Sequence, residues 1–376
     1  MSQISSDVRV AGANLPGPAA PASSLLRRDR LITSDRVMVG LARLGALCLI
    51  SMLVLLLIVL VYSAWLSIHT FGFRFLATSQ WRPNELAVPA RDAAGQVIMQ
   101  GGKAVMTKIP PEFGALPAIF GTAVSSMLAL VFAVPLSFGA ALFLTRLSPN
   151  WLAAPVSFLI EFLAAIPSIA YGMWGLFVLA PFLQQHVEPA IRGGLGWIPG
   201  VESWLFSESA KAGGQTLVRI LPLTGRDMFC GGLVLAIMIL PIITAISRDI
   251  LRTVPRAQME GTLALGATWW QSSKEMLLYS RSGLFGAVML GLARAAGETM
   301  AITMVIGNNN RISTSIFAPA QTMASLLANE FAEASTALHR SALAEVALIL
   351  LLMSLLFNVT ARWLVVGSNS RSAAAH

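Results

Sequence analysis

Charged side chains are scarce in this sequence. Only 12% of its 376 residues are Asp, Glu, Lys or Arg, whereas 56% are apolar. A soluble domain averages roughly 25% charged residues, so the composition excludes an ordinary soluble domain and predicts an integral membrane protein. The net charge of +8 does not indicate a nucleic-acid partner, because the basic residues are dispersed among hydrophobic runs, where such residues orient membrane spans.

Cysteines and catalytic motifs are lacking as well. The two cysteines are too few for a disulfide scaffold, and the four histidines are isolated. No HExxH, GxSxG or CxxC pattern occurs, which excludes the common metalloproteases and serine hydrolases. There is also no G-x-x-x-x-G-K-[ST] loop. We therefore expect no enzymatic activity, no metal and no bound cofactor in this chain, and any ATP to be used by a partner.

Long apolar runs are what the sequence does contain. A membrane span needs about 20 mostly apolar residues. The third run carries Glu161, Pro167 and Pro181, and its length suits one bent helix better than two. Six membrane helices in an all-α bundle are the prediction, with runs at Leu44–Leu66, Pro117–Thr145, Leu152–Phe182, Gly231–Ser247, Leu284–Ile306 and Ala342–Val366.

Basic residues beside these runs predict the orientation, because short cytoplasmic loops carry an excess of Lys and Arg. They cluster before the first run, between the fourth and fifth runs, and around the end of the sixth, where Arg362 and Arg371 lie. With six spans all three clusters fall on one side, so we expect both termini to be cytoplasmic. The expected segments are a disordered leader at 1–36, a first membrane helix at 37–70, an external segment at 71–116, a five-helix core at 117–366, and a tail at 367–376. Within the core we expect external segments at 185–229 and 308–341 and a cytoplasmic coupling loop at 248–282.

The fifth run reads "GLARAAGETM" and holds two opposite charges, Arg294 and Glu298. Positions four residues apart share one face of a continuous helix, so the two side chains are expected to touch. A charge at mid-membrane costs roughly 2.5 to 3.5 kcal/mol. Two interpretations remain open: an ion pair that locks this span to its neighbours, or an Arg294 that lines a polar pathway with Thr299 as a hydroxyl donor. For Glu161 a packing role and a pathway role are equally open.

The segment between the fourth and fifth runs predicts a short helix, a glycine break and an aromatic continuation. A cytoplasmic helix that exposes apolar residues suits a groove on a soluble partner, although a helix lying on the lipid interface has the same pattern. The residues expected to form this coupling element are Glu260, Leu263, Ala264, Leu265, Gly266, Ala267 and Trp270.

These motifs resemble a known family. Glu260, Ala264 and Gly266, followed by the apolar stretch 276–278, resemble the "EAA" loop of type I ABC importer permeases, with Gly261 and Thr262 in place of its two alanines. The stretches "EFLAAIPSIAYGMWGLFVLAP" and "GLARAAGETMAITMVIGN" resemble the third and fifth spans of the phosphate-specific branch, closest to the PstC type. The resemblance covers roughly residues 40 to 365.

The resemblance implies a six-helix, MetI-like permease in the bacterial inner membrane. It also implies a heterodimer with a PstA-type permease subunit, two copies of an ATPase that uses ATP, and an external phosphate-binding protein. Arg294 would then offer a planar guanidinium fork to phosphate. An importer for another oxyanion, such as sulfate or molybdate, and a mainly structural or signalling subunit are the alternatives. A stand-alone channel is disfavoured, because it would not need the coupling element.

Overall fold

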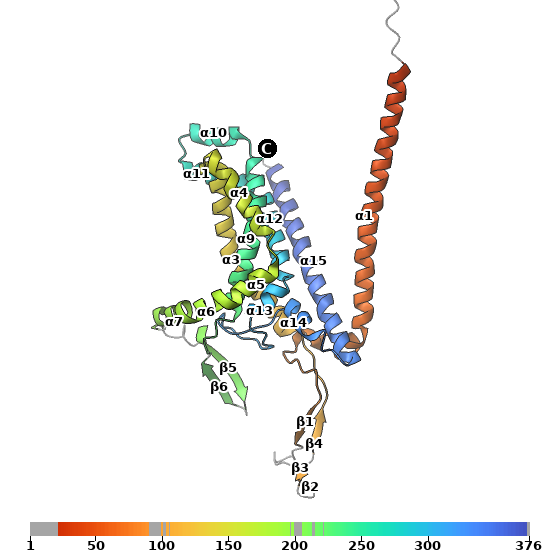
Figure 1. Cartoon of the computed structure of the whole chain (residues 1–376), viewed down its shortest axis with the longest axis vertical. Coiled ribbons are helices and arrows are strands. Elements are labelled where there is room, and N and C mark those ends of the chain that lie inside the picture. Colours follow the sequence, from red (N-terminus) through yellow and green to blue (C-terminus); the bar gives the residue numbers. More distant parts are fainter. Residues whose placement is uncertain are drawn as a thin grey trace, which may run out of the picture. The chain divides into compact units, whose positions relative to one another are not determined.

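The computed structural model describes the backbone of residues 22–89, 99–100, 103–104, 106–195, 197–198, 205–212, 215–220 and 222–373. This part of the chain is mainly helical (Figure 1). Of the expected disordered leader, residues 1–21 lie outside the described residues. The remainder of that leader is part of helix α1, so the expected boundary at residue 36 differs from the structure.

The α-helices of the described chain are α1 (Ala22–Phe71), α2 (Arg74–Ala77), α3 (Leu116–Leu142), α4 (Asn150–Ala164), α5 (Ser168–Trp174), α6 (Ala180–Phe182), α7 (Glu188–Leu195), α9 (Met228–Arg252), α10 (Arg256–Ala264), α11 (Trp269–Tyr279), α12 (Arg281–Ala296), α13 (Met300–Val305), α14 (Met323–Glu330) and α15 (Ala337–Ala373). Three π-helical turns join or extend them: η1 (Phe143–Leu147), η2 (Gly175–Leu179) and η3 (Leu183–Val187).

Two segments expected to be external contain β-hairpins. In the segment 71–116, β1 (Leu86–Pro89) pairs antiparallel with β4 (Met106–Ile109), and β2 (Met99–Gln100) pairs with β3 (Lys103–Ala104). In the segment 185–229, β5 (Ser207–Ala212) pairs with β6 (Gln215–Ile220). The sequence analysis predicted no strands in either place.

Four described helical stretches are long and apolar enough to cross a membrane: Val37–Phe71, Leu116–Leu147, Met228–Arg252 and Ala337–Thr360. Two bent pairs pass the same test jointly, namely 151–164 with 168–194 at a 90° bend, and 269–279 with 281–296 at a 70° bend. The described chain therefore has four to six candidate spans, which agrees with the six apolar runs. The third run forms two helices rather than one, because Pro167 disfavours the helical conformation of the residue before it.

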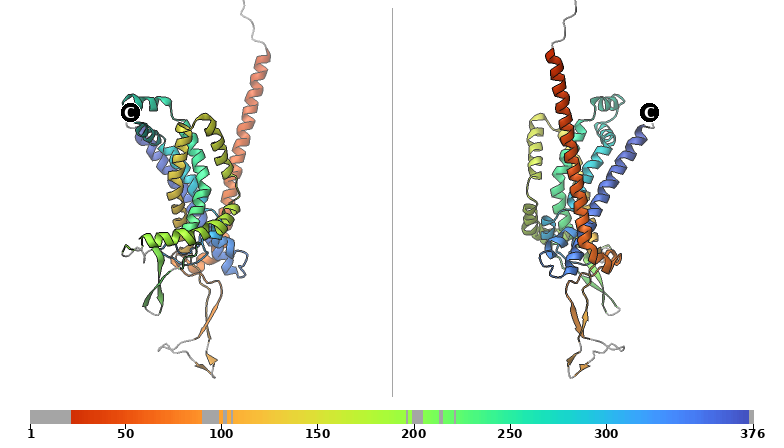
Figure 2. Two further views of the ribbon diagram at one scale, coloured as in Figure 1. Left: turned by 60° about the vertical axis from the view of Figure 1, so that its left-hand side comes forward. Right: turned by 90° about the vertical axis from the view of Figure 1, so that its right-hand side faces the viewer.

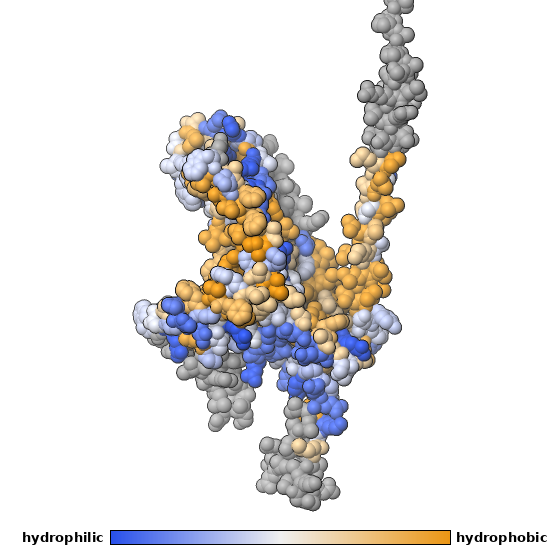
Figure 3. Space-filling view, in the orientation of Figure 1, coloured by the Kyte–Doolittle hydropathy of each residue, from blue (hydrophilic) through white to orange (hydrophobic). Residues whose placement is uncertain are grey.

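Helix α9 lies at the centre of the core and packs against α3, α4 and α12. Figures 1 and 2 show α5 to α7 running crosswise to these helices, at the end opposite to α10 and α11. Helix α15 ends on the same side of the bundle as α10 and α11. Apolar residues cover the middle of the bundle and hydrophilic residues gather at its ends, as Figure 3 shows. This distribution is that of a bundle within a bilayer.

Close packing, rather than exclusion of water, holds helices together in lipid. The buried core includes Leu235, Ile239 and Ile243 of α9, none of which is exposed. Gly291 of α12 faces this row: a β-carbon there would lie 2.6 Å from Cδ1 of Ile243. The absence of a side chain at Gly291 therefore sets how closely α12 approaches α9.

Candidate functional site

The apolar run that carries Arg294 and Glu298 is not one helix. Helix α12 ends at Ala296, and α13 begins at Met300 after a break of three residues. The prediction of a continuous helix over 284–306 is therefore wrong. Gly297 is a weak helix former at the point where the run is interrupted, and non-helical backbone at membrane depth is tolerated where it is buried or lines a wet cavity.

The break changes the relation between the two charges. Among the described residues, no ion pair or hydrogen bond joins Arg294 to Glu298. Arg294 is exposed in the last turn of α12, whereas Glu298 is only 9% exposed. The Glu298 carboxylate Oε1 accepts a hydrogen bond of 3.3 Å from the Ala301 N–H in the first turn of α13. The expected contact between the two side chains is therefore replaced by a cap on α13.

Helix ends explain why each charge is tolerated where it lies. A cation is favoured near the C-terminus of a helix and an anion near the N-terminus, each by roughly 0.3 to 1 kcal/mol. Arg294 and Glu298 occupy these two ends at one break. Thr299 is half-buried, and its hydroxyl donates 3.4 Å to the Gly297 carbonyl, so its donor is used locally.

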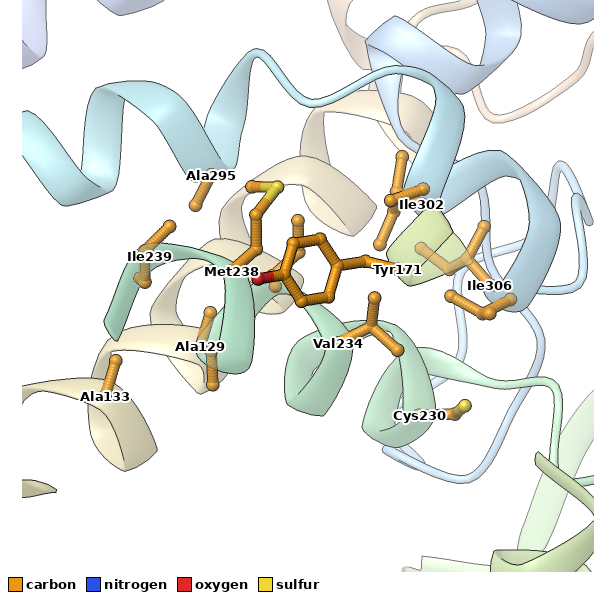
Figure 4. Close-up of a cluster of buried hydrophobic side chains, with 14 of the residues drawn as sticks. Ala129, Ala133, Tyr171, Cys230, Val234, Met238, Ile239, Ala295, Ile302 and Ile306 are labelled. Atoms are coloured by element: carbon orange, nitrogen blue, oxygen red, sulfur yellow. The ribbon is translucent and has the colours of Figure 1, made fainter. Parts of the chain in front are cut away.

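Helix α5 holds this break in place. A β-carbon on Gly172 would lie 2.8 Å from Cα of Ala301, so α5 and α13 are in backbone contact. The neighbouring Tyr171 is buried among apolar side chains of α9 and α13 (Figure 4), and its hydroxyl donates 2.8 Å to the Leu163 carbonyl of α4. Tyr171 thus links the break to the end of α4, a role that the sequence analysis did not identify.

An ion cluster joins α4 to α9. Arg248 Nη2 donates 3.0 Å to Glu161 Oε1 and 3.0 Å to Asp249 Oδ1. Helix α9 continues four residues past the expected start of the coupling loop at 248, to Arg252, and the Arg248 side chain is buried. Glu161 is therefore paired with a cation from another helix. Such a partner is expected for an acid within an apolar run, because ionisable residues there usually pair with one another.

The coupling element has the expected helix, break and helix. Helix α10 ends at Ala264, Gly266 adopts φ +84°, and α11 begins at Trp269 behind a Thr268 capping box. Leu265 is 89% exposed and Trp270 is 63% exposed. The structure brings together, at the bundle end opposite to α5 to α7, the residues predicted for this element: Glu260, Leu263, Ala264, Leu265, Gly266, Ala267 and Trp270.

A further pair of acids, Glu188 and Asp227, lies outside the predicted site. Both side chains are fully buried, and Asp227 Oδ1 accepts 2.8 Å from the Cys230 N–H at the start of α9. Burial raises the pKa of Asp227 well above its ordinary value, and the neighbouring Glu188 charge raises it further.

Among the described residues, no group of three His, Cys, Asp or Glu side chains is arranged to hold a metal ion.

Comparisons with known proteins place this geometry in context. The family described as "Binding-protein-dependent transport system inner membrane component" matches residues 133–371. The phosphate transport system permease protein PstC of Haemophilus influenzae is 41% identical over 323 residues, which cover 86% of this chain and 90% of that protein. The protein of the same name from Mesorhizobium japonicum is 38% identical over 361 residues, which cover 96% of this chain and 98% of that protein.

A solved structure of the MetNI methionine ABC transporter, in an inward-facing conformation, has a TM-score of 0.45 to this chain at 16% sequence identity. The match covers 68% of this chain and 94% of the other.

Proposed function

Because this chain belongs to the family of binding-protein-dependent transport system inner membrane components, we propose that it is the permease subunit of an ATP-driven importer of inorganic phosphate. The relatives named as phosphate transport permeases cover nearly its whole length. The membrane is the bacterial cytoplasmic membrane, with α10 and α11 on its cytoplasmic side.

The environment of Arg294 is the observation that supports an anion as the substrate. Arg294 is exposed, lies at a helix break, and has no carboxylate partner among the described residues. A guanidinium presents N–H donors in a fork that matches two phosphate oxygens. Glu298 caps α13 and leaves that fork free. A single free arginine favours entry of the anion and still permits its release, as conduction requires.

The energy for transport comes from a separate ATPase. The exposed Leu265 and Trp270 of the coupling element present an apolar surface to a groove on that subunit. Two copies of the ATPase, a PstA-type permease and an external phosphate-binding protein complete the importer. ATP binds to the ATPase and not to this chain.

The test replaces Arg294 with Gln in the reconstituted complex and measures uptake of radiolabelled phosphate per assembled complex. A hydrogen bond to a charged group contributes about 1.5 to 3 kcal/mol, so uptake at low phosphate should fall roughly 10-fold to 150-fold. Arg340→Gln is the matched control, because Arg340 is an exposed arginine at the start of α15. Normal uptake by the Arg294→Gln complex would remove this residue from the pathway.

Competition identifies the oxyanion. Unlabelled phosphate should suppress uptake by the wild-type complex, whereas equal sulfate or molybdate should not. Suppression by sulfate or molybdate, but not by phosphate, would assign the permease to a different oxyanion. A chain that purifies without an ATPase and without a second permease would contradict the importer itself.

A further inference from the structure

Arg248 is nearly buried, but part of its guanidinium is unused. Its Nε and Nη2 atoms donate to Asp249 Oδ1 at 3.1 and 3.0 Å, and Nη2 also donates to Glu161 Oε1 at 3.0 Å. Among the described residues, Nη1 makes no hydrogen bond. A guanidinium carries five N–H donors, so Arg248 retains donors for another acceptor.

The two carboxylates that hold Arg248 are themselves accessible. The side chain of Arg248 is 8% exposed, whereas those of Glu161 and Asp249 are 56% and 63% exposed. Glu161 therefore pairs with Arg248 from an exposed position on α4. An accessible carboxylate is disfavoured against lipid, so the exposed Glu161 and Asp249 indicate that this face of α4 and α9 is turned to water or protein.

Packing contacts and hydrogen bonds connect this cluster with the helix break beside Arg294. The phenol of Tyr171 on α5 donates 2.8 Å to the carbonyl of Leu163 on α4. The adjacent Gly172 is in backbone contact with α13, which follows Arg294 across the break. Leu163 follows Glu161 by two residues on α4, and Glu161 binds Arg248 of α9. Helix α4 contributes both Glu161 and Leu163, α5 contributes Tyr171, and α9 contributes Arg248. Helix α9 then leads to the coupling element through residues 253–255.

We infer that Arg248 is a second cationic contact for the transported anion, between Arg294 and the coupling element, and that Glu161 is the carboxylate which the anion displaces from it. This inference rests on the proposed function. Asp249 remains bonded through Nε and keeps the guanidinium oriented, while Nη1 and Nη2 face the anion. Glu161 returns when the anion leaves, which prevents Arg248 from retaining it.

The competing interpretation is that Glu161 and Arg248 only fasten α4 to α9. The two interpretations differ in how Glu161→Gln should behave. An amide retains an oxygen acceptor for packing but competes less with a phosphate for the guanidinium. If the Glu161 carboxylate competes with phosphate for Arg248, its removal lowers both the half-saturating phosphate concentration and the maximal rate, because phosphate then binds more tightly and leaves more slowly. Loss of a fastening contact does not lower the half-saturating concentration.

The experiment uses the reconstituted complex of both permeases and the ATPase, with phosphate uptake and ATP hydrolysis measured together. Arg248→Gln should reduce uptake at least tenfold, and Glu161→Gln should lower the half-saturating phosphate concentration severalfold with a lower maximal rate. The matched control is Arg252→Gln, an exposed arginine one helical turn later on α9, which should transport normally. If Arg248→Gln fails to assemble, Arg248→Lys keeps the charge but removes the fork, and reduced uptake by an assembled complex supports the inference.

Unchanged uptake by Arg248→Gln, or by Arg248→Lys where only that variant assembles, overturns the inference. An unchanged or raised half-saturating concentration in Glu161→Gln also overturns it and leaves a fastening contact. These results are distinct from failure of the proposed function, in which the wild-type complex itself takes up no phosphate.

Discussion

A single residue, Glu298, illustrates how a break in a helix reassigns a charge. In an unbroken helix it would neutralise Arg294 from one turn away. In the structure it caps α13 through the Ala301 N–H instead. Capping and pairing make different demands on the side chain, since a cap needs an acceptor oxygen and a buried ion pair needs a full negative charge. The two roles can therefore be separated by substitution.

Glu298→Ala should lower the stability of the complex by about 1 kcal/mol, the usual contribution of a helix cap. Glu298→Gln keeps an acceptor oxygen and loses only the favourable charge at the helix end, about 0.3 to 1 kcal/mol. Thermal unfolding of the purified complex measures both values. A loss of about 3 to 5 kcal/mol in Glu298→Gln would show instead that a buried ion pair had been broken.

Asp227 predicts a dependence of stability on pH. Its pKa is raised in the folded protein, chiefly by burial and further by the charge of Glu188, so folding favours the protonated form. That stabilisation is complete below the unfolded pKa of about 3.9 and is lost as the pH rises through the raised folded pKa. Thermal stability of the complex should therefore fall as the pH increases across this window.

Glu188→Gln tests the cause of that dependence. It removes a like charge beside Asp227, so the folded pKa of Asp227 should drop and the loss of stability should begin at a lower pH. Glu333→Gln, at an exposed acid, serves as the control and should leave the profile unchanged. An identical profile in Glu188→Gln and the wild type would exclude coupling between the two acids.

At the scale of elements, apolar runs predicted where helices lie but not where they break. Composition is a local property, and it located α3, α9 and α15 correctly. The end of α12 depends on Gly297 and on a carboxylate that satisfies the next helix, which hydropathy does not record. The contact of Arg248 with Glu161 spans 87 residues of sequence. The sequence pattern predicted instead a local pair, Arg294 with Glu298, because the two residues are four positions apart.

The contact between α5 and α13 is a second property that the sequence did not reveal. Gly172→Ala would place a β-carbon 2.8 Å from Cα of Ala301 and 3.0 Å from Sδ of Met304. Overpacking of this kind costs typically about 1 to 3 kcal/mol, and thermal unfolding should show the loss. Because α5 holds the break beside Arg294, phosphate uptake should fall as well.

Gly286→Ala is the matched control for that substitution. Gly286 lies within α12, and a β-carbon there meets nothing within 4 Å. Alanine favours a helix by about 0.5 to 1 kcal/mol over glycine, so this variant should be as stable as the wild type or more so. Equal losses in Gly172→Ala and Gly286→Ala would show that helix propensity, not close approach, governs both positions.

At the scale of the whole molecule, the two ends of the bundle carry different elements. The crosswise helices α5 to α7 lie at one end and the coupling element at the other (Figure 1). Arg248 lies on α9 itself, and the break beside Arg294 lies between two helices that contact α9. Helix α9 continues toward α10. A movement imposed on α10 therefore has a direct route to both arginines.

A substitution at Leu265 tests whether the coupling element contacts the ATPase or the lipid surface. Leu265 is 89% exposed between α10 and α11, where an apolar anchor in a partner's groove would lie. Interface anchors contribute about 2 kcal/mol or more, so Leu265→Ser should reduce the ATPase retained on purification by more than tenfold. Phe73→Ser is the control, since Phe73 is 91% exposed beside α2 and outside the coupling element. If Leu265→Ser retains the ATPase as the wild type does and only weakens binding to vesicles, then the coupling helix lies on lipid and the ATPase docks elsewhere.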